Sequence, residues 1–293
     1  MLFRSPAIER HLRSFLDEDG NLRYEDPHSR PADGRIYSAE MATLPFAAMA
    51  RVWPDHPALD VAIQWWLDTV NKAGGVRSHA NLTAEGSYIV AYPLAVVAGV
   101  RRREDLARLA VEHLLARRER LFVDGALYQQ RRLDGRYAFR NWARGCAWYI
   151  LGLTRSLIEL GDFPERALLE DALREVVQWI LQFQRADGLW SCYVDEPETG
   201  PETSGSSGIA AALAKGAVHG LLPHSAFEAA RRTLAALEGY LTPDGFLTGV
   251  CQMNKGGEPL QRGGYRVISQ MGMGLMAQLL ATVRAQRLGP ASP

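Results

Sequence analysis

A short motif recurs along the chain at nearly even intervals, and it constrains the fold more than any other feature. Asp-Gly supplies the positive φ angles of a tight turn, and the alternating apolar residues after it predict a short strand. The copies are EDGNLRY, VDGALYQ, ADGLWSCY and PDGFLTGV, with a weaker copy, KAGGVRS. Their glycines, Gly20, Gly75, Gly125, Gly188 and Gly245, lie 50 to 63 residues apart. A period of about 56 residues has room for two helices and a small hairpin.

The segments between these turns have helical periodicity. Leu169, Leu173, Val176 and Ile180, for example, form one apolar stripe at spacings of three and four residues. Helical hairpins that repeat without a long strand pattern predict an all-α fold, an (α/α)6-type toroid or incomplete barrel, with residues 1–293 as a single domain. The helices are expected at residues 5–17, 38–52, 57–73, 83–99, 103–119, 141–160, 165–184, 203–219, 224–240 and 265–286.

The two helices of each repeat differ in composition. The second helices are charged, as in 103–119 with Arg117, and are expected in an outer ring. The first helices, such as 84–99, 143–153 and 203–217, are rich in Ala, Gly, Ser and large apolar residues, and are expected to pack closely in an inner ring. Their polar residues lie at their N-terminal ends, where unpaired N–H groups favour anions. These ends are predicted to meet at one mouth, the binding cleft.

Composition restricts the partners. Thirty-three Lys and Arg balance thirty-three Asp and Glu, so no overall field draws the chain to nucleic acid or to an anionic membrane. Without a signal-peptide pattern or a long uncharged apolar run, a cytoplasmic protein is expected. Cys146, Cys192 and Cys251 lack metal-site spacing and are predicted to be buried thiols, with no metal, disulfide or cofactor.

Two glutamates are the leading candidates for chemistry. Glu40 and Glu85 both follow Ala and both begin a predicted inner helix, one repeat apart. Two carboxylates at one mouth would suit glycosidic bond cleavage or proton transfer to carbon. Alternatively, each acid caps the dipole of its own helix. His79 precedes Glu85 and faces the mouth, unless it lies in a solvated loop.

Two tryptophans and an arginine form a candidate substrate surface. Trp142, Arg144 and Trp148 begin the inner helix at 141–160. Flat indole faces suit sugar rings, and a guanidinium can hold a carboxylate through two parallel hydrogen bonds. The alternative is that both tryptophans belong to the core.

Four further motifs follow one another along the chain: Trp142–Trp148, Gly188–Trp190 with Pro197–Thr199, Glu202–Ser206 and Gly249–Cys251. In order and approximate spacing they resemble the motifs of the unsaturated uronyl hydrolases, glycoside hydrolase families 88 and 105. The resemblance implies an (α/α)6 barrel. It also implies removal of the 4,5-unsaturated uronic acid that a polysaccharide lyase leaves at a non-reducing end, by hydration of the double bond.

The same resemblance suggests roles for individual residues. In Glu85-Gly86-Ser87-Tyr88, Glu85 stands where the family has a proton-donating aspartate, and Tyr88 completes the motif. A second family aspartate falls near Glu40. Arg144 and Trp148 match the substrate-contacting Arg and Trp, and Trp142 opens that motif.

Besides Glu85, four positions depart from the family pattern. Gln129, which is expected to face the substrate, and Ser191 stand where the family has histidines. Met253-Asn254 and Met271-Gly272 stand in place of the C-terminal Gly-Thr and His-Gly elements. The leading hypothesis is a hydrolase that releases a terminal, unsaturated uronic-acid sugar from an oligosaccharide. A catalytically silent glycan-binding or regulatory relative is the alternative, and a sugar epimerase is a third possibility.

Overall fold

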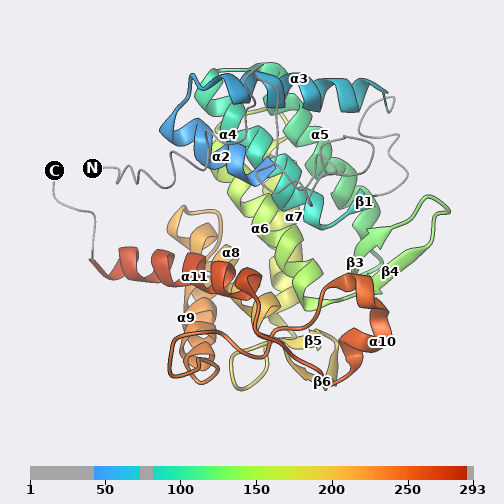
Figure 1. Ribbon diagram of the computed structural model, residues 1–293, viewed down its shortest axis with the longest axis vertical. Coiled ribbons are helices and arrows are strands. Elements are labelled where there is room, and N and C mark those ends of the chain that lie inside the picture. The colour runs from blue at the N-terminus through green and yellow to red at the C-terminus, as the bar shows by residue number, and fades with distance from the viewer. Residues whose placement is uncertain (1–42, 73–81, 289–293) are drawn as a thin grey trace.

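The computed structural model describes residues 43–72 and 82–288. Within these ranges helices alternate with short strands, and each predicted helix is present (Figure 1). The predicted helix at 5–17 lies outside the described residues. The helices of the repeat are α2 (Thr43–Val52), α3 (Pro57–Lys72), α4 (Tyr92–Arg101), α5 (Glu104–Leu121), α6 (Ala143–Leu160), α7 (Arg166–Leu181), α8 (Thr203–Val218), α9 (His224–Glu238) and α11 (Gln270–Leu288).

The described helices form the two predicted rings of an α/α toroid. The inner helices α2, α4, α6, α8 and α11 pack in that order, each on the next. Behind them, α3, α5, α7 and α9 each pack against the inner helix that precedes them in the chain.

Small residues explain how closely the inner helices approach. A Cβ atom on Gly152 of α6 would lie 2.2 Å from the Ser87 carbonyl carbon. Between α6 and α8, a Cβ on Gly205 would lie 2.6 Å from the Cβ of Ala143, and one on Gly208 would lie 2.7 Å from that of Ala147. No side chain larger than hydrogen fits these positions without movement, which is why the inner helices are rich in Gly and Ala.

The inner helix predicted at 83–99 begins irregularly. A five-residue π-helix, η3 (Ser87–Ala91), precedes α4. Pro93, near the start of α4, has no N–H to donate to the preceding turn, so a regular α-helical ladder cannot run through this point. A widened turn therefore carries Ser87 and Tyr88 into the ring.

The turn-plus-strand motifs form more sheet than expected. β3 (Ala126–Arg131) is flanked by β1 (Leu82–Thr83), β2 (Phe122–Val123) and β4 (Tyr137–Arg140), all antiparallel to it. The Asp-Gly turn between β2 and β3 is confirmed, with φ of 51° at Asp124 and 70° at Gly125. β5 (Ser191–Tyr193) pairs with β6 (Glu196–Pro201). Two short helices, η4 (Asn254–Gly256) and α10 (Gly257–Arg262), were not predicted.

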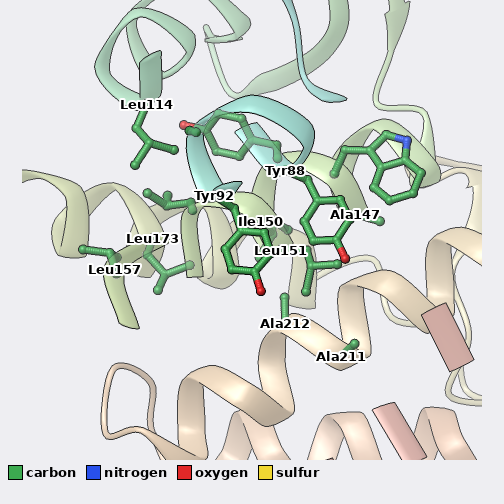
Figure 2. Packing of buried hydrophobic residues seen from close by; sticks show 14 of the residues in the cluster. Tyr88, Tyr92, Leu114, Ala147, Ile150, Leu151, Leu157, Leu173, Ala211 and Ala212 are labelled. Carbon is green, nitrogen blue, oxygen red and sulfur yellow. The ribbon is translucent and has the colours of Figure 1, made fainter. Parts of the chain in front are cut away.

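The core of the toroid is aromatic and aliphatic. Figure 2 shows Tyr88 and Tyr92 side by side, with Ala211 and Ala212 of α8 facing them. The tyrosine rings are stacked, with centroids 5.7 Å apart.

All three cysteines are buried free thiols, as predicted. Among the described residues, no helix combines the length and the hydropathy needed to cross a membrane.

α5 lies in the outer ring, as its charged composition predicted. One of its charged side chains, Arg117, is nevertheless buried, with 2% of its surface exposed. Its Nε donates to the Thr83 carbonyl oxygen at 2.9 Å and its Nη1 to that of His113 at 3.0 Å. A guanidinium can be buried where protein oxygens accept its protons. Here one acceptor lies on β1 and the other lies one turn earlier on α5 itself.

Candidate functional site

The start of α6 is held by a strained strand. Phe139 and Asn141 both have positive φ angles, 54° and 57°, in a region that L-residues other than Asn and Asp rarely adopt. The N–H of Phe139 donates to Glu258 Oε1 at 2.8 Å. The Asn141 side chain accepts from the N–H of Leu127 at 2.9 Å and donates to Asp195 at 2.8 Å. These contacts from β3, α10 and the β5–β6 turn fix where Trp142 and α6 begin.

Arg144 is buried in the first turn of α6, with 3% of its surface exposed. Its Nη1 donates to the Cys251 carbonyl oxygen at 3.0 Å and lies 3.4 Å from Ser204 Oγ; its Nη2 donates to the Gln252 carbonyl oxygen. These contacts use three of the five N–H groups of the guanidinium. In this structure Arg144 therefore joins α6 to the loop that follows α9.

Glu202 completes the same network and was missed as a functional candidate. Its fully buried carboxylate caps α8, accepting from the N–H of Ser204 at 3.0 Å and of Gly205 at 2.6 Å. It also accepts from the N–H of Cys251 at 3.0 Å. Arg144 and Glu202 thus hold the two sides of one peptide segment. The signal in the sequence was an acid immediately before a run of small helix-starting residues, a capping pattern.

Trp142 directly precedes α6 and is buried. The ring is 1% exposed and packs against Phe139, with centroids 5.5 Å apart. The Arg144 guanidinium lies over it, 4.6 Å from the centroid. Because neither face of the ring is open, Trp142 is a core residue in this structure. This agrees with the alternative interpretation of the sequence, in which the tryptophans belong to the core.

Glu85 lies in a half-buried turn at the N-terminal end of an inner helix, where the sequence placed it. The preceding residue, Ala84, donates its N–H to the Gln129 carbonyl oxygen at 2.8 Å, which fixes the turn to β3. On the other side, Gly86 packs directly on Arg117: a Cβ there would lie 1.8 Å from Nη2. The buried guanidinium of Arg117 therefore contacts the residue that follows Glu85.

Gln129 is brought to the same place. Its side chain is fully buried, and among the described residues neither its amide nitrogen nor its amide oxygen has a hydrogen-bond partner. A Cβ on Gly145 would lie 2.8 Å from its Oε1, so the amide packs against α6 next to Arg144. A buried amide without partners costs about 1–3 kcal/mol, which makes Gln129 an unusual residue to keep at a purely structural position.

Tyr88 and Trp148 form one aromatic wall. Their rings are stacked, with centroids 5.5 Å apart and planes 15° from parallel. Across the ring of helices, Gln278 of α11 donates its amide to the Tyr88 hydroxyl at 3.2 Å. Both aromatic rings are buried, and the Trp148 Nε1 proton has no acceptor. Three contacts therefore connect the candidate residues. Ala84, next to Glu85, binds the backbone of Gln129. The Gln129 side chain packs on Gly145, next to Arg144, and Tyr88 stacks on Trp148.

Glu40 and His79 lie outside the described residues, so their distance from Glu85 stays a prediction. Within the described ranges, no cluster of three or more His, Cys, Asp or Glu side chains is arranged to bind a metal ion.

Arg262 of α10 joins this helix to β5 and β6. This side chain donates to Glu196 of β6 at 2.8 Å and to Glu258 at 2.7 Å, and its guanidinium lies 3.8 Å from the centre of the Tyr193 ring. Burial alone would raise the pKa of Glu258, but the hydrogen bonds from Arg262 and the Phe139 N–H outweigh it and lower that pKa. Figure 1 shows α10 beside β4, β5 and β6.

The fold is shared with solved glycoside hydrolases. A Clostridium acetobutylicum glycoside hydrolase from family 105 matches with a TM-score of 0.77 and 19% identity, over 95% of this chain and 86% of that one. A possible member of the same family from Salmonella enterica matches with a TM-score of 0.75 and 19% identity, over 87% of this chain and 74% of that one.

Sequence comparison gives the family. The chain is similar to the unsaturated rhamnogalacturonyl hydrolase YesR of Bacillus subtilis, with 28% identity over 160 residues. That alignment spans 53% of this chain and 43%, less than half, of YesR. The family model described as Glycosyl Hydrolase Family 88 matches residues 57–288. Because this match covers most of the sequence, the chain belongs to glycosyl hydrolase family 88.

Proposed function

We propose that this chain is a hydrolase that releases a terminal unsaturated uronic-acid sugar from an oligosaccharide, with Glu85 as the proton donor. The observation that carries the proposal is the position of Glu85. In a chain of family 88, it is a half-buried carboxylate at the mouth end of an inner helix, anchored to β3 through Ala84 and backed by Arg117.

The chemistry follows from the substrate. The double bond of an unsaturated uronic acid is an enol ether, so protonation at C4 leaves an oxygen-stabilised cation at C5. Water then adds to C5 and gives its proton to a carboxylate. The resulting hemiketal opens the ring to a ketone, and the hemiacetal that remains at C1 expels the neighbouring sugar. Glu85 would supply the proton, and Glu40 would be the partner that positions the water.

The other residues support this step. Tyr88 follows Glu85 by three residues, and its stacking on Trp148 fixes the Glu85 turn relative to α6. Gln129 has an unpaired amide that a substrate hydroxyl or carboxylate could satisfy. Arg144 and Glu202 hold the loop at 249–252 against the mouth. In this proposal Arg144 positions that loop, and His79 contributes to substrate binding from the segment before Glu85.

The name of the Bacillus relative supports one substrate to test first: the unsaturated galacturonyl end of a rhamnogalacturonan fragment. Unsaturated glucuronyl disaccharides should be tested in parallel. The purified chain is expected to abolish the ultraviolet absorbance of the double bond in at least one of these substrates. The cytoplasmic location predicted from the sequence stays part of this proposal.

A glycan-binding relative without turnover is the second candidate, and Gln129 is the observation that favours it. An amide cannot exchange a proton at neutral pH as the histidine of the family pattern can. Calorimetry on the same substrate panel separates the two functions. Binding of an unsaturated disaccharide without any loss of its absorbance would support the second candidate and contradict the first.

A further inference from the structure

A cavity lies far from the proposed mouth, between the C-terminal halves of α8 and α11. Its volume is about 530 Å³, within the range of small-molecule sites. Lys215 and His219 line it from one face of α8, four residues apart, while Thr282 and Gln286 face them with the same spacing on α11. Polar groups therefore converge on one cavity from two inner helices.

The charge around this cavity is unbalanced. Lys215 is half-buried and makes no hydrogen bond or ion pair within the described part of the chain. The cations near it are Arg155 and Arg51, and the carboxylate in the same group, Glu159, is already bound by Arg51. Among the described residues, this group therefore has three cations and one carboxylate, which is paired with Arg51. Burial and the neighbouring Arg155 lower the pKa of Lys215, and burial and Lys215 lower that of His219.

Arg155 is itself incompletely paired. Its Nη1 donates to Gln278, one turn before Thr282 on α11, but its buried Nε proton has no acceptor in the part of the chain that the structure describes. The guanidinium lies 4.4 Å from the centre of the Tyr92 ring. An anion in the cavity would add the negative charge that this group lacks.

The cavity is separate from the mouth. From Ser204 at the mouth to Lys215, α8 rises about 16 Å. The stacked rings of Tyr88, Tyr92 and Trp148 and the Arg155–Gln278 pair fill the ring of helices between the two ends. A molecule at Lys215 would therefore not reach Glu85.

We propose that this cavity is a second binding site, for a small polyhydroxylated anion whose carboxylate or phosphate group is held by Lys215 and His219. Thr282 and Gln286 would bind its hydroxyl groups. The site does not depend on the proposed reaction, since none of its residues belongs to the mouth.

Calorimetry with four probes tests the site: inorganic phosphate, glucuronate, glucose 6-phosphate and, as a neutral control, glucose. We expect at least one anion to bind and glucose not to bind. Comparison of phosphate, glucuronate and glucose 6-phosphate shows whether the phosphate or the carboxylate group is preferred. Lys215→Met, which keeps the apolar stem, should weaken anion binding by about tenfold or more, whereas Lys215→Arg should retain most of it.

Glu85→Gln is the matched control, because it alters the mouth and leaves the cavity intact. Anion binding should be unchanged in Glu85→Gln, and hydrolysis of an unsaturated disaccharide should be unchanged in Lys215→Met. Binding that is lost in Glu85→Gln and kept in Lys215→Met would place the anion at the mouth and overturn the proposal. So would the absence of anion binding to the wild-type chain, in which case Lys215 only offsets the dipole at the end of α8.

Discussion

At the scale of single residues, the two sides of the Glu85 turn show what the sequence could and could not predict. Glu85 was identified because an acid at the start of an apolar helix is conspicuous. The buried Arg117, which packs on the next residue, was not identified, because it is one of several arginines on a charged outer helix. Its partners are backbone oxygens of Thr83 and His113, and backbone acceptors leave no trace in side-chain composition.

Gly86→Ala tests whether this packing positions the acid. The new Cβ would overlap the buried Arg117 guanidinium, which could move only by losing its hydrogen bonds. The free energy of unfolding should fall by about 1–3 kcal/mol, and kcat should fall with it. Denaturant titration and initial rates measure both.

Gly99→Ala on α4 is the control for that substitution. Its Cβ would meet only the Glu159 carbonyl oxygen, at an ordinary 3.5 Å. Alanine favours a helix over glycine by up to about 1 kcal/mol, so stability should hold or rise. Equal effects of the two substitutions would mean that the Arg117 contact has no special role.

At the scale of elements, the junction between β4 and α6 is where the structure adds most to the sequence. Helical periodicity and the Trp142–Trp148 motif indicated an inner helix here. They gave no sign of the two positive φ angles before it, because the restraining groups, Leu127, Asp195 and Glu258, come from distant segments. The same distance hid the partners of Arg144, more than one hundred residues away in the chain.

Asn141 stabilises this junction through its side-chain hydrogen bonds and its tolerance of a positive φ. Two substitutions separate these two contributions. Asn141→Ala loses the side-chain hydrogen bonds and also places alanine at a positive φ, so it should cost about 2–4 kcal/mol. Asn141→Gly loses the same bonds without the backbone penalty, and should cost about 1 kcal/mol less. Thermal melts of both variants test the difference. If glycine were as damaging as alanine, the strained backbone would not be the reason for Asn.

At the scale of the whole molecule, the toroid followed from the sequence because its period, stripes and turns agree with one another. The four-stranded sheet did not, since β3 takes partners from both sides of it in the chain and the two-residue β1 is too short to show alternation. β1 and β4 of that sheet lead into the inner helices at η3 and α6, and Glu258 of α10 binds the backbone of β4. The rings of helices were therefore predictable from the sequence, and the elements at their N-terminal ends were not.

The ion pair between Glu258 and Arg262 makes the stability of the fold depend on pH. The folded-state pKa of Glu258 is lowered, so its contribution to stability is complete above the unfolded value near 4.5 and is lost as the pH falls through the folded value. Glu258→Gln should therefore cost about 0.5–1 kcal/mol at pH 7, after allowance for solvent screening, and progressively less below about pH 4. Urea titrations at both pH values measure this, and a cost independent of pH would contradict the assigned ion pair.

The central claim, that Glu85 protonates the substrate, is tested most directly by the Glu85→Gln variant. The measurement is the initial rate at which the double-bond absorbance of an unsaturated rhamnogalacturonan disaccharide disappears, for wild type and variant side by side. Glutamine keeps the shape of the side chain but has no proton to give, so the rate should fall by about 10²-fold or more, the usual contribution of a general acid. A variant as fast as the wild type would show that the proton comes from another group.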